Sequence, residues 1–125
     1  MSSPTLIKSY KAGAAVGANL LVKFDSVDLT VIKAAAATDL IIGASMEIAA
    51  DAAGDRIDVA MSGIANVIAG GTITRGAKVT ADSAGKAVAA APSAGANAHV
   101  AGVCLYGAAS GDLTPILLAP SVMQG

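Results

Sequence analysis

The segment AGDRIDV at positions 53–59 is almost repeated as SGDLTPI at positions 110–116, and this repeat is the main indication of the fold. In both copies a Gly-Asp pair stands directly before a run with strand-like composition. Gly tolerates positive φ and Asp accepts hydrogen bonds from nearby backbone amides, so Gly-Asp is typical of a tight turn. Each copy therefore predicts a turn followed by a β-strand.

Further residues repeat at nearly the same distance along the chain. They keep one order, with offsets of 57 to 59 residues: Gly17-Ala18 with Gly76-Ala77, Asp25 with Asp82, Val31 with Val88, and Gly43 with Gly102. These matches align residues 6–61 with residues 64–118. Since 125 residues make one ordinary domain, we predict a single β domain, residues 1–125, that contains two copies of one unit.

Each unit is predicted to contain four strands. The first two are joined by a turn, which is Asp25-Ser26 in the first half and DSAG at 82–85 in the second. The third is apolar and carries a central glycine, Gly43 or Gly102, which indicates a bulge or a sharp bend. The predicted strands are 20–24, 29–32, 40–45 and 57–61, followed by 78–80, 86–88, 99–104 and 113–118.

Helix competes with strand in the Ala-rich segments 33–37, 46–53 and 87–91. Each is short and is bounded by Thr-Asp, Gly or Pro, and isolated helices of that length are marginal. We therefore predict an all-β fold, a small β-barrel or β-sandwich of about 8–10 short strands built from two similar halves, with at most short helical turns.

The composition predicts a thin hydrophobic core. Thirty of the 125 residues are Ala, and the only aromatic residues are Tyr10, Phe24 and Tyr106. Apolar burial stabilises in proportion to area, and Ala offers little of it. A small domain with such a core usually gains stability from oligomerisation or from a partner, so we expect a homo-oligomer.

Charge and hydropathy argue against nucleic acid and membrane as partners. The net charge is −1, without a run of either sign, and nucleic-acid binders normally combine a basic patch with aromatic residues. The mean hydropathy is +0.67, but the longest uncharged stretch, 87–111, is broken by Pro92 and four glycines. The first 13 residues lack the pattern of a secretory signal, and a single cysteine allows no intrachain disulfide. We expect a soluble protein made in the cytoplasm.

Residues that could carry catalysis are sparse. His99 is the only histidine, at the start of an apolar strand, and Cys104 alternates with apolar neighbours in the same strand. We interpret His99 as a strand-end or surface residue and Cys104 as a small buried hydrophobe, because a triad or a zinc site needs further partners. The segment 71–78 resembles a phosphate-binding loop, but Ala77 separates the second Gly from Lys78, and a strand rather than a helix is predicted to follow.

The acidic residues also have structural interpretations. Asp55 and Asp112 directly follow turn glycines, where Asp caps the turn. Asp58 is expected on the solvated face of a strand. Two pairs of carboxylates, Asp55 with Asp58 and Glu47 with Asp51, are the candidates for acid/base chemistry or a hard-cation site. Neither pair has a further metal ligand or catalytic residue near it in the sequence. We therefore assign no catalytic, cofactor-binding or metal-binding residues, no cofactor and no enzymatic activity.

The stretches 53–65, 69–76 and 80–90, together with Gly111-Asp112 and 115–120, resemble the capsid cement (head decoration) proteins of tailed bacteriophages. The resemblance covers the chain from about residue 8 to residue 125 and rests on turns and strands, with no catalytic signature. It implies a small β-rich structural protein of the virion that binds the major capsid protein on the outer capsid surface and strengthens the shell. It also implies self-association, with a homotrimer favoured and a dimer second.

Two questions stay open from sequence alone. Residues 1–11 are a candidate N-terminal arm that adds a strand to a capsid subunit, or else the first strand of the domain's own sheet. The C-terminal residues 120–125 are a second candidate for capsid contact. The alternative function is a stand-alone β-fold binding module for a glycan or peptide. Glycan sites usually present aromatic faces, and the chain has only three aromatic residues. A hydrolase that relies on carboxylates alone is the weakest alternative.

Overall fold

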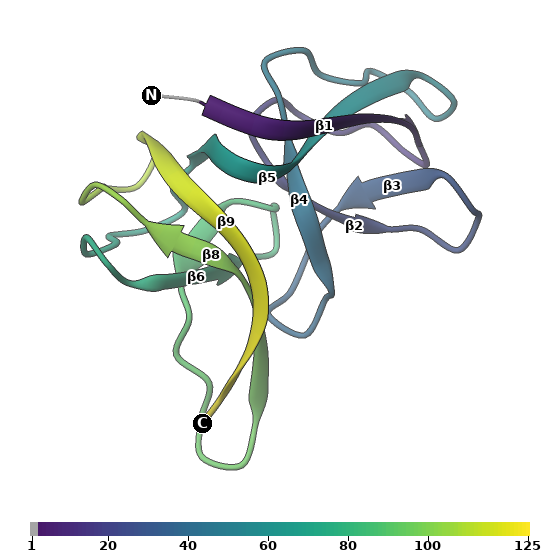
Figure 1. Ribbon diagram of the computed structural model, residues 1–125. Coiled ribbons are helices and arrows are strands. Elements are labelled where there is room, and N and C mark those ends of the chain that lie inside the picture. The colour runs from purple at the N-terminus through teal and green to yellow at the C-terminus, as the bar shows by residue number, and fades with distance from the viewer. Residues whose placement is uncertain (1–2) are drawn as a thin grey trace.

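The computed structural model describes residues 3–125, which form nine β-strands and no helix (Figure 1). The all-β prediction is therefore confirmed, with the expected number of strands. The strands are β1 (Ser3–Ala12), β2 (Leu21–Phe24), β3 (Thr30–Lys33), β4 (Ile41–Ser45), β5 (Arg56–Ile68), β6 (Lys78–Ala81), β7 (Ala87–Ala89), β8 (Asn97–Cys104) and β9 (Leu113–Gln124).

All strands belong to one sheet in the order β1-β3-β2-β4-β5-β9-β8-β6-β7, so the chain is not a single closed barrel. An additional β1–β5 pairing closes the first five strands of this order into a ring. On the other side, a parallel bridge between Ala69 and Ala87 brings β7 back to the end of β5. The molecule thus has two lobes of the same topology, lobe 1 (residues 3–61) and lobe 2 (residues 62–125).

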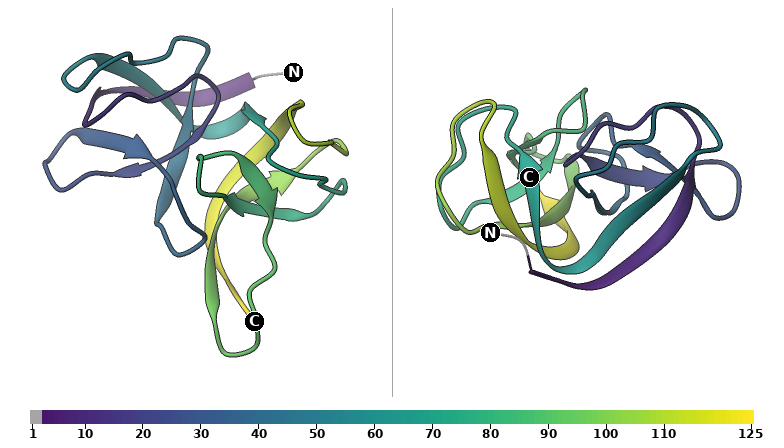
Figure 2. Two further views of the ribbon diagram at one scale, coloured as in Figure 1. Left: turned by 180° about the vertical axis from the view of Figure 1, so that it is seen from behind. Right: turned by 90° about the horizontal axis from the view of Figure 1, so that it is seen from above.

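The strand β5 belongs to both lobes. Its first part pairs with β1 and β4, and its last part pairs with β9 from Gly63 to Ile68. Gly63 lies at the junction with φ +86, and a Cβ there would lie 2.6 Å from the backbone of Ser3 and Thr5. Only Gly accepts both conditions. Figure 2 shows the two lobes side by side with β5 passing from one to the other.

Equivalent backbone contacts recur in the two lobes. The strand pair Val22–Gly43 of lobe 1 corresponds to Val79–Gly102 of lobe 2. The isolated bridge Val16–Ala50 corresponds to Ile73–Ala108. The 2.8 Å hydrogen bond from Ala34 N–H to Leu21 O corresponds to the one from Ala90 N–H to Lys78 O, also 2.8 Å. Corresponding members of these pairs are 56 to 59 residues apart, which is the spacing of the sequence matches.

The bulges predicted at the strand glycines are confirmed. The register shifts opposite Gly43 in β4 and between Val100 and Gly102 in β8. At both glycines the space for a Cβ is filled by a backbone carbonyl of the neighbouring strand, Ala60 O or Leu117 O. The strands approach this closely because no side chain separates them.

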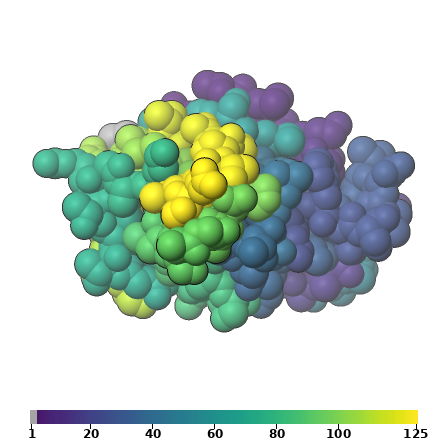
Figure 3. Space-filling view, turned by 90° about the horizontal axis from the view of Figure 1, so that it is seen from below, coloured from purple at the N-terminus to yellow at the C-terminus, as the bar shows by residue number. Residues whose placement is uncertain are grey.

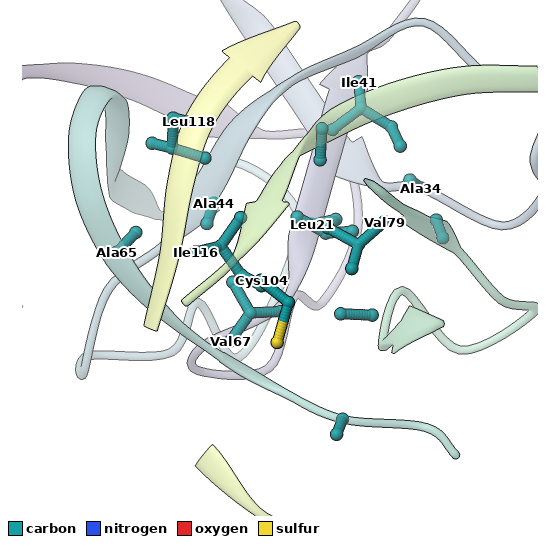
Figure 4. Packing of buried hydrophobic residues seen from close by; sticks show 14 of the residues in the cluster. Leu21, Ala34, Ile41, Ala44, Ala65, Val67, Val79, Cys104, Ile116 and Leu118 are labelled. Atoms are coloured by element: carbon teal, nitrogen blue, oxygen red, sulfur yellow. The ribbon is translucent and has the colours of Figure 1, made fainter. Parts of the chain in front are cut away.

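Alanine dominates the packing, as the composition predicts. The larger core cluster joins both lobes, and nine of its 17 buried residues are Ala. Leu21 and Ile41 of lobe 1 meet Val79 and Ile116 of lobe 2 in this cluster (Figure 4). A smaller cluster lies inside lobe 1 and takes buried residues from β1, β2, β3, β4 and β5, among them Ile57. The high share of small side chains lets the two lobes share one core across β5.

Some lengths and assignments differ from the sequence prediction. β1, β5 and β9 span 10, 13 and 12 residues, whereas the sequence predicts short strands. None of the three Ala-rich segments forms a helical turn, because each ends within a few residues at a turn or a proline. Residues 34–37 and 46–53 are irregular, with bends and turns, and the segment 87–91 begins with the strand β7. Ser3–Ala12 forms the first strand of the domain's own sheet, the second of the two alternatives for the N-terminus; Met1 and Ser2 lie outside the described residues.

Candidate interaction surface

A polar network joins β1 to β5 on the surface of lobe 1. Ser9 and Asp58 are register partners, and Ser9 Oγ donates a 2.7 Å hydrogen bond to Asp58 Oδ1. Arg56 Nη2 lies 3.1 Å from the same oxygen, and Arg56 Nε donates to Ser9 Oγ at 3.2 Å. The guanidinium is thereby held in one direction, although the Arg56 side chain remains 74% exposed.

Two shallow grooves flank Arg56. One has a volume of about 420 Å³ and is lined by Ile7, Ile48 and Asp58 among others. The other, of about 440 Å³, runs between β1 and the turn that joins β2 to β3, and is lined by Val27 and Leu29. Arg56 lines both grooves. The ion pair of Arg56 with Asp58 therefore lies between two sets of apolar side chains.

Several apolar side chains at these grooves face solvent. Ile48 is 81% exposed, and Val27 and Leu29 are each 64% exposed. Contiguous exposed apolar groups rimmed by polar residues are typical of interaction sites. We name the residues Ile7, Ser9, Ile48, Arg56 and Asp58 the Arg56 surface. Asp58 already accepts a hydrogen bond from Ser9 and forms an ion pair with Arg56, so its carboxylate is not free to bind a small ligand. The chemistry of this surface is therefore suited to contact with a protein.

The structure places the two candidate nucleophile or base residues as predicted. His99 is the third residue of β8, is partly exposed and donates its backbone N–H to Ala37 O at 2.7 Å. Cys104 ends the same strand and is fully buried, with its thiol directed to Tyr106 O at 2.7 Å and to Thr114 Oγ1 at 3.4 Å. Cys104 is thus buried in the core, whereas His99 is partly exposed.

The turn-capping roles of the acidic residues are confirmed. Asp55 Oδ2 accepts hydrogen bonds from the amides of Asp51 and Ala52, and Asp112 Oδ2 accepts one from Ala109. Glu47 lines the first groove and is exposed. Within residues 3–125 no three His, Cys, Asp or Glu residues lie close enough together to hold a metal ion.

The segment that resembles a phosphate loop is followed by the strand β6, as predicted, and not by a helix. Ile73 at its centre is buried and pairs with Ala108 across a bridge. The glycines of the segment therefore lie in a corner between strands. No helix in the described part of the chain is long and apolar enough to cross a bilayer.

A second ionic pair lies between β2 and the loop that follows β3. Lys23 Nζ is 3.0 Å from Asp39 Oδ1, and Asp39 Oδ2 accepts a hydrogen bond from Ala35 N–H at 2.8 Å. Burial by itself would raise the pKa of Asp39, but the bonds from Ala35 and Lys23 outweigh it and hold that pKa below its ordinary value. This pair fixes the loop that contacts His99 of lobe 2.

Sequence reasoning does not reveal the Arg56 surface. Ser9 and Arg56 are 47 residues apart, and Ile48 lies in an Ala-rich segment where helix competes with strand. The one local signal is the predicted exposure of Asp58 on a strand. Only the pairing of β1 with β5 brings these residues together.

The fold is shared with the head fiber gp8.5 N base of bacteriophage phi29, known from a crystal structure. The TM-score is 0.70 at 23% sequence identity, and the match covers 96% of this chain and 98% of that chain. No protein-family model matches the sequence. No curated protein matches it either.

Proposed function

We propose that this chain is a structural protein of a tailed-phage head that binds the major capsid protein on the outer surface of the shell and cements it. The observation that carries the proposal is the fold shared with a phage head fiber base over 96% of the chain. The sequence resemblance of residues 53–65, 69–76 and 80–90 to cement proteins supports it independently. In this role the protein is made in the host cytoplasm, catalyses no reaction and is needed in many copies per virion.

The Arg56 surface is our candidate for the capsid contact. A cement protein needs a surface that stays soluble before assembly and becomes buried afterwards. Ile7 and Ile48 supply apolar area for burial, while Arg56 is held in place by Ser9 and Asp58. A charged group that is already oriented loses less freedom on binding, which favours affinity and register.

Self-association is the second part of the proposal. The shared core is rich in Ala, and additional burial between copies would stabilise it. A homotrimer, with a dimer as second choice, also gives several capsid contacts per particle, so that weak individual contacts add to a high avidity.

The proposal is tested by mixing the purified protein with expanded capsids that lack decoration. We expect saturable co-sedimentation at a fixed number of copies per capsid, and greater resistance of coated shells to heat and to low salt. Binding that never saturates, or no binding at all, would contradict the proposal.

The capsid contact is tested separately with Ile48→Asp. Ile48 is 81% exposed, so its replacement should leave the melting temperature unchanged. A buried Ile contributes about 1.5–3 kcal/mol, so its loss should weaken capsid binding by at least about tenfold. Leu113→Asp, at a residue of β9 that is 56% exposed and lies outside both candidate capsid contacts, is the matched control and should bind as the wild type does. Equal binding of both variants would remove the Arg56 surface from the proposal while leaving coating itself intact.

A peptide-binding module is the second candidate, because the groove beside Ile48 combines apolar walls with Arg56 and Asp58. The same capsid experiment distinguishes the two functions. Binding of soluble peptides without coating of capsids would favour the module.

A further inference from the structure

Leu29 has a backbone conformation that its side chain does not favour. It ends the turn between β2 and β3 with φ +62, a region that bulky residues rarely adopt. The side chain buries little area inside the molecule, since it is 64% exposed next to the equally exposed Val27. A strained residue that presents an apolar side chain to solvent points to a function outside the chain.

The equivalent turn of lobe 2 shows what such a turn does in this fold. It joins β6 to β7, and Gly85 occupies the position of Leu29 with φ +77. This turn rests on lobe 1, where Gly85 O accepts a 2.8 Å hydrogen bond from Leu21 N–H. A Cβ on Gly85 would lie 3.2 Å from Ala34 O, so the turn packs directly on the backbone. Leu21 and Ala34, which receive it, are fully buried.

The corresponding receiving surface in lobe 2 is open. Lys78 occupies the position of Leu21 and Ala90 that of Ala34, because Ala90 N–H donates to Lys78 O just as Ala34 N–H donates to Leu21 O. Lys78 is exposed and Ala90 is half-buried, whereas both counterparts in lobe 1 are fully buried. Each copy therefore has one turn that rests on its own lobe alone and one receiving surface that no turn covers.

The two unused elements have opposite charge. The turn of lobe 1 presents Asp28 between Val27 and Leu29, and the receiving segment of lobe 2 presents Arg75 and Lys78. Neither Asp28 nor these two cations forms an ion pair within residues 3–125. Lobe 1 carries seven acidic and five basic residues, while lobe 2 carries two acidic and three basic ones. The charges thus favour contact between lobe 1 of one copy and lobe 2 of another.

The positions of the two elements suit such a contact. In Figures 1 and 2 the turn between β2 and β3 lies at one end of the molecule, and the start of β6 lies at the other. Figure 3 shows the same separation, with the blue segment that includes this turn at one end and the teal segment that precedes β6 at the other. We propose that the turn of residues 25–29 of one copy docks on Lys78 and Ala90 of a second copy, head to tail, so that the contact between lobes within the chain is repeated between chains.

The contact between chains differs in detail from the contact within the chain. Leu29 O already accepts a hydrogen bond from Lys11 N–H at 2.9 Å, and the Leu29 side chain prevents the close backbone approach that Gly85 allows. The docking is therefore mediated by the side chains of Val27, Asp28 and Leu29. The docking rests on the self-association proposed above. It does not require a capsid, so it can fail or succeed independently of capsid coating.

The test is a charge exchange followed by sedimentation velocity over a wide range of protein concentration. We expect the wild type to self-associate, and Asp28→Lys or Lys78→Asp alone to weaken association by about tenfold or more, since each brings like charges together. The double variant Asp28→Lys with Lys78→Asp should regain most of the lost affinity. A wild type that stays monomeric at every concentration, or a double variant no better than the single ones, would overturn the proposal.

Leu29→Gly provides a second measurement that does not depend on charge. Gly relieves the strained φ, so this variant should fold with an equal or higher melting temperature and yet associate about tenfold more weakly. Ser26→Ala, in the same turn, is the matched control and should associate as the wild type does. Unchanged association of Leu29→Gly would exclude the turn from the interface.

Discussion

Replacing Gly102 by Ala should destabilise the protein strongly. Gly102 is buried in β8 opposite Leu118 of β9, at the bulge. A Cβ would overlap Leu117 O and would lie 2.9 Å from Leu117 C and 3.1 Å from Ala119 N. All three atoms are backbone, so relief requires that β9 move away from β8 and weaken the longest hairpin of lobe 2. Overpacking a core costs about 1–3 kcal/mol, and a rigid backbone neighbour places this substitution at the upper end.

The magnitude converts to a large shift in melting temperature. An unfolding entropy of about 2.1 cal/mol/K per residue corresponds to ~0.26 kcal/mol/K for a chain of 125 residues. A loss of ~3 kcal/mol therefore lowers the melting temperature by ~11 °C. Circular dichroism or calorimetry measures this directly.

Gly71→Ala is the matched control for this prediction. A Cβ on Gly71 would have no neighbouring atom within 4 Å, and Gly71 does not have positive φ, so Ala should be neutral or stabilise by up to about 1 kcal/mol. A melting temperature of Gly102→Ala equal to that of Gly71→Ala would refute the reasoning, because it would mean that the strands do not approach each other at the bulge.

Three further predictions concern single side chains. Because the pKa of Asp39 is lowered in the folded state, its contribution to stability should be fully present above the unfolded pKa of about 4 and should disappear as the pH falls through the folded pKa; an NMR titration that places this pKa at or above its ordinary value would contradict the Lys23–Asp39 geometry. Leu29→Gly should raise the free energy of unfolding by about 0.5 kcal/mol, since the relief of left-handed strain exceeds the added chain entropy, and a lower stability in denaturant titration would argue against the strain. The buried thiol of Cys104 should react with a thiol reagent far more slowly in the native than in the unfolded protein, and equal rates would show that the core is open.

The parts of the fold that can be predicted from sequence depend on local chemistry. Gly54 and Gly111 have φ +91, and the aspartates that follow them cap the turns, as Gly-Asp pairs indicate. The glycines inside β4 and β8 indicate bulges because a strand interior offers few other reasons for Gly. Such signals lie within a few residues of each other, so one sequence suffices to recognise them.

The parts that local patterns do not predict depend on distant pairing. The second half of β5 carries no clear strand signal, because Gly63 and Asn66, residue types that are rare in strands, interrupt its apolar residues. Its partner β9 lies about 50 residues away. The N-terminal segment is ambiguous in sequence for the same reason, since only the pairing with β5 makes it part of the sheet. The Arg56 surface follows from that pairing, and so no local pattern could predict it.

Cryo-electron microscopy of undecorated capsids mixed with an excess of this protein would show whether it coats the outer shell. If the chain cements a phage head, the difference map will show ordered density for its two-lobed shape at fixed positions of the outer lattice, with lobe 1 against the shell. Capsids whose outer surface stays bare at saturating protein concentration, under conditions in which the protein is folded, would contradict that claim.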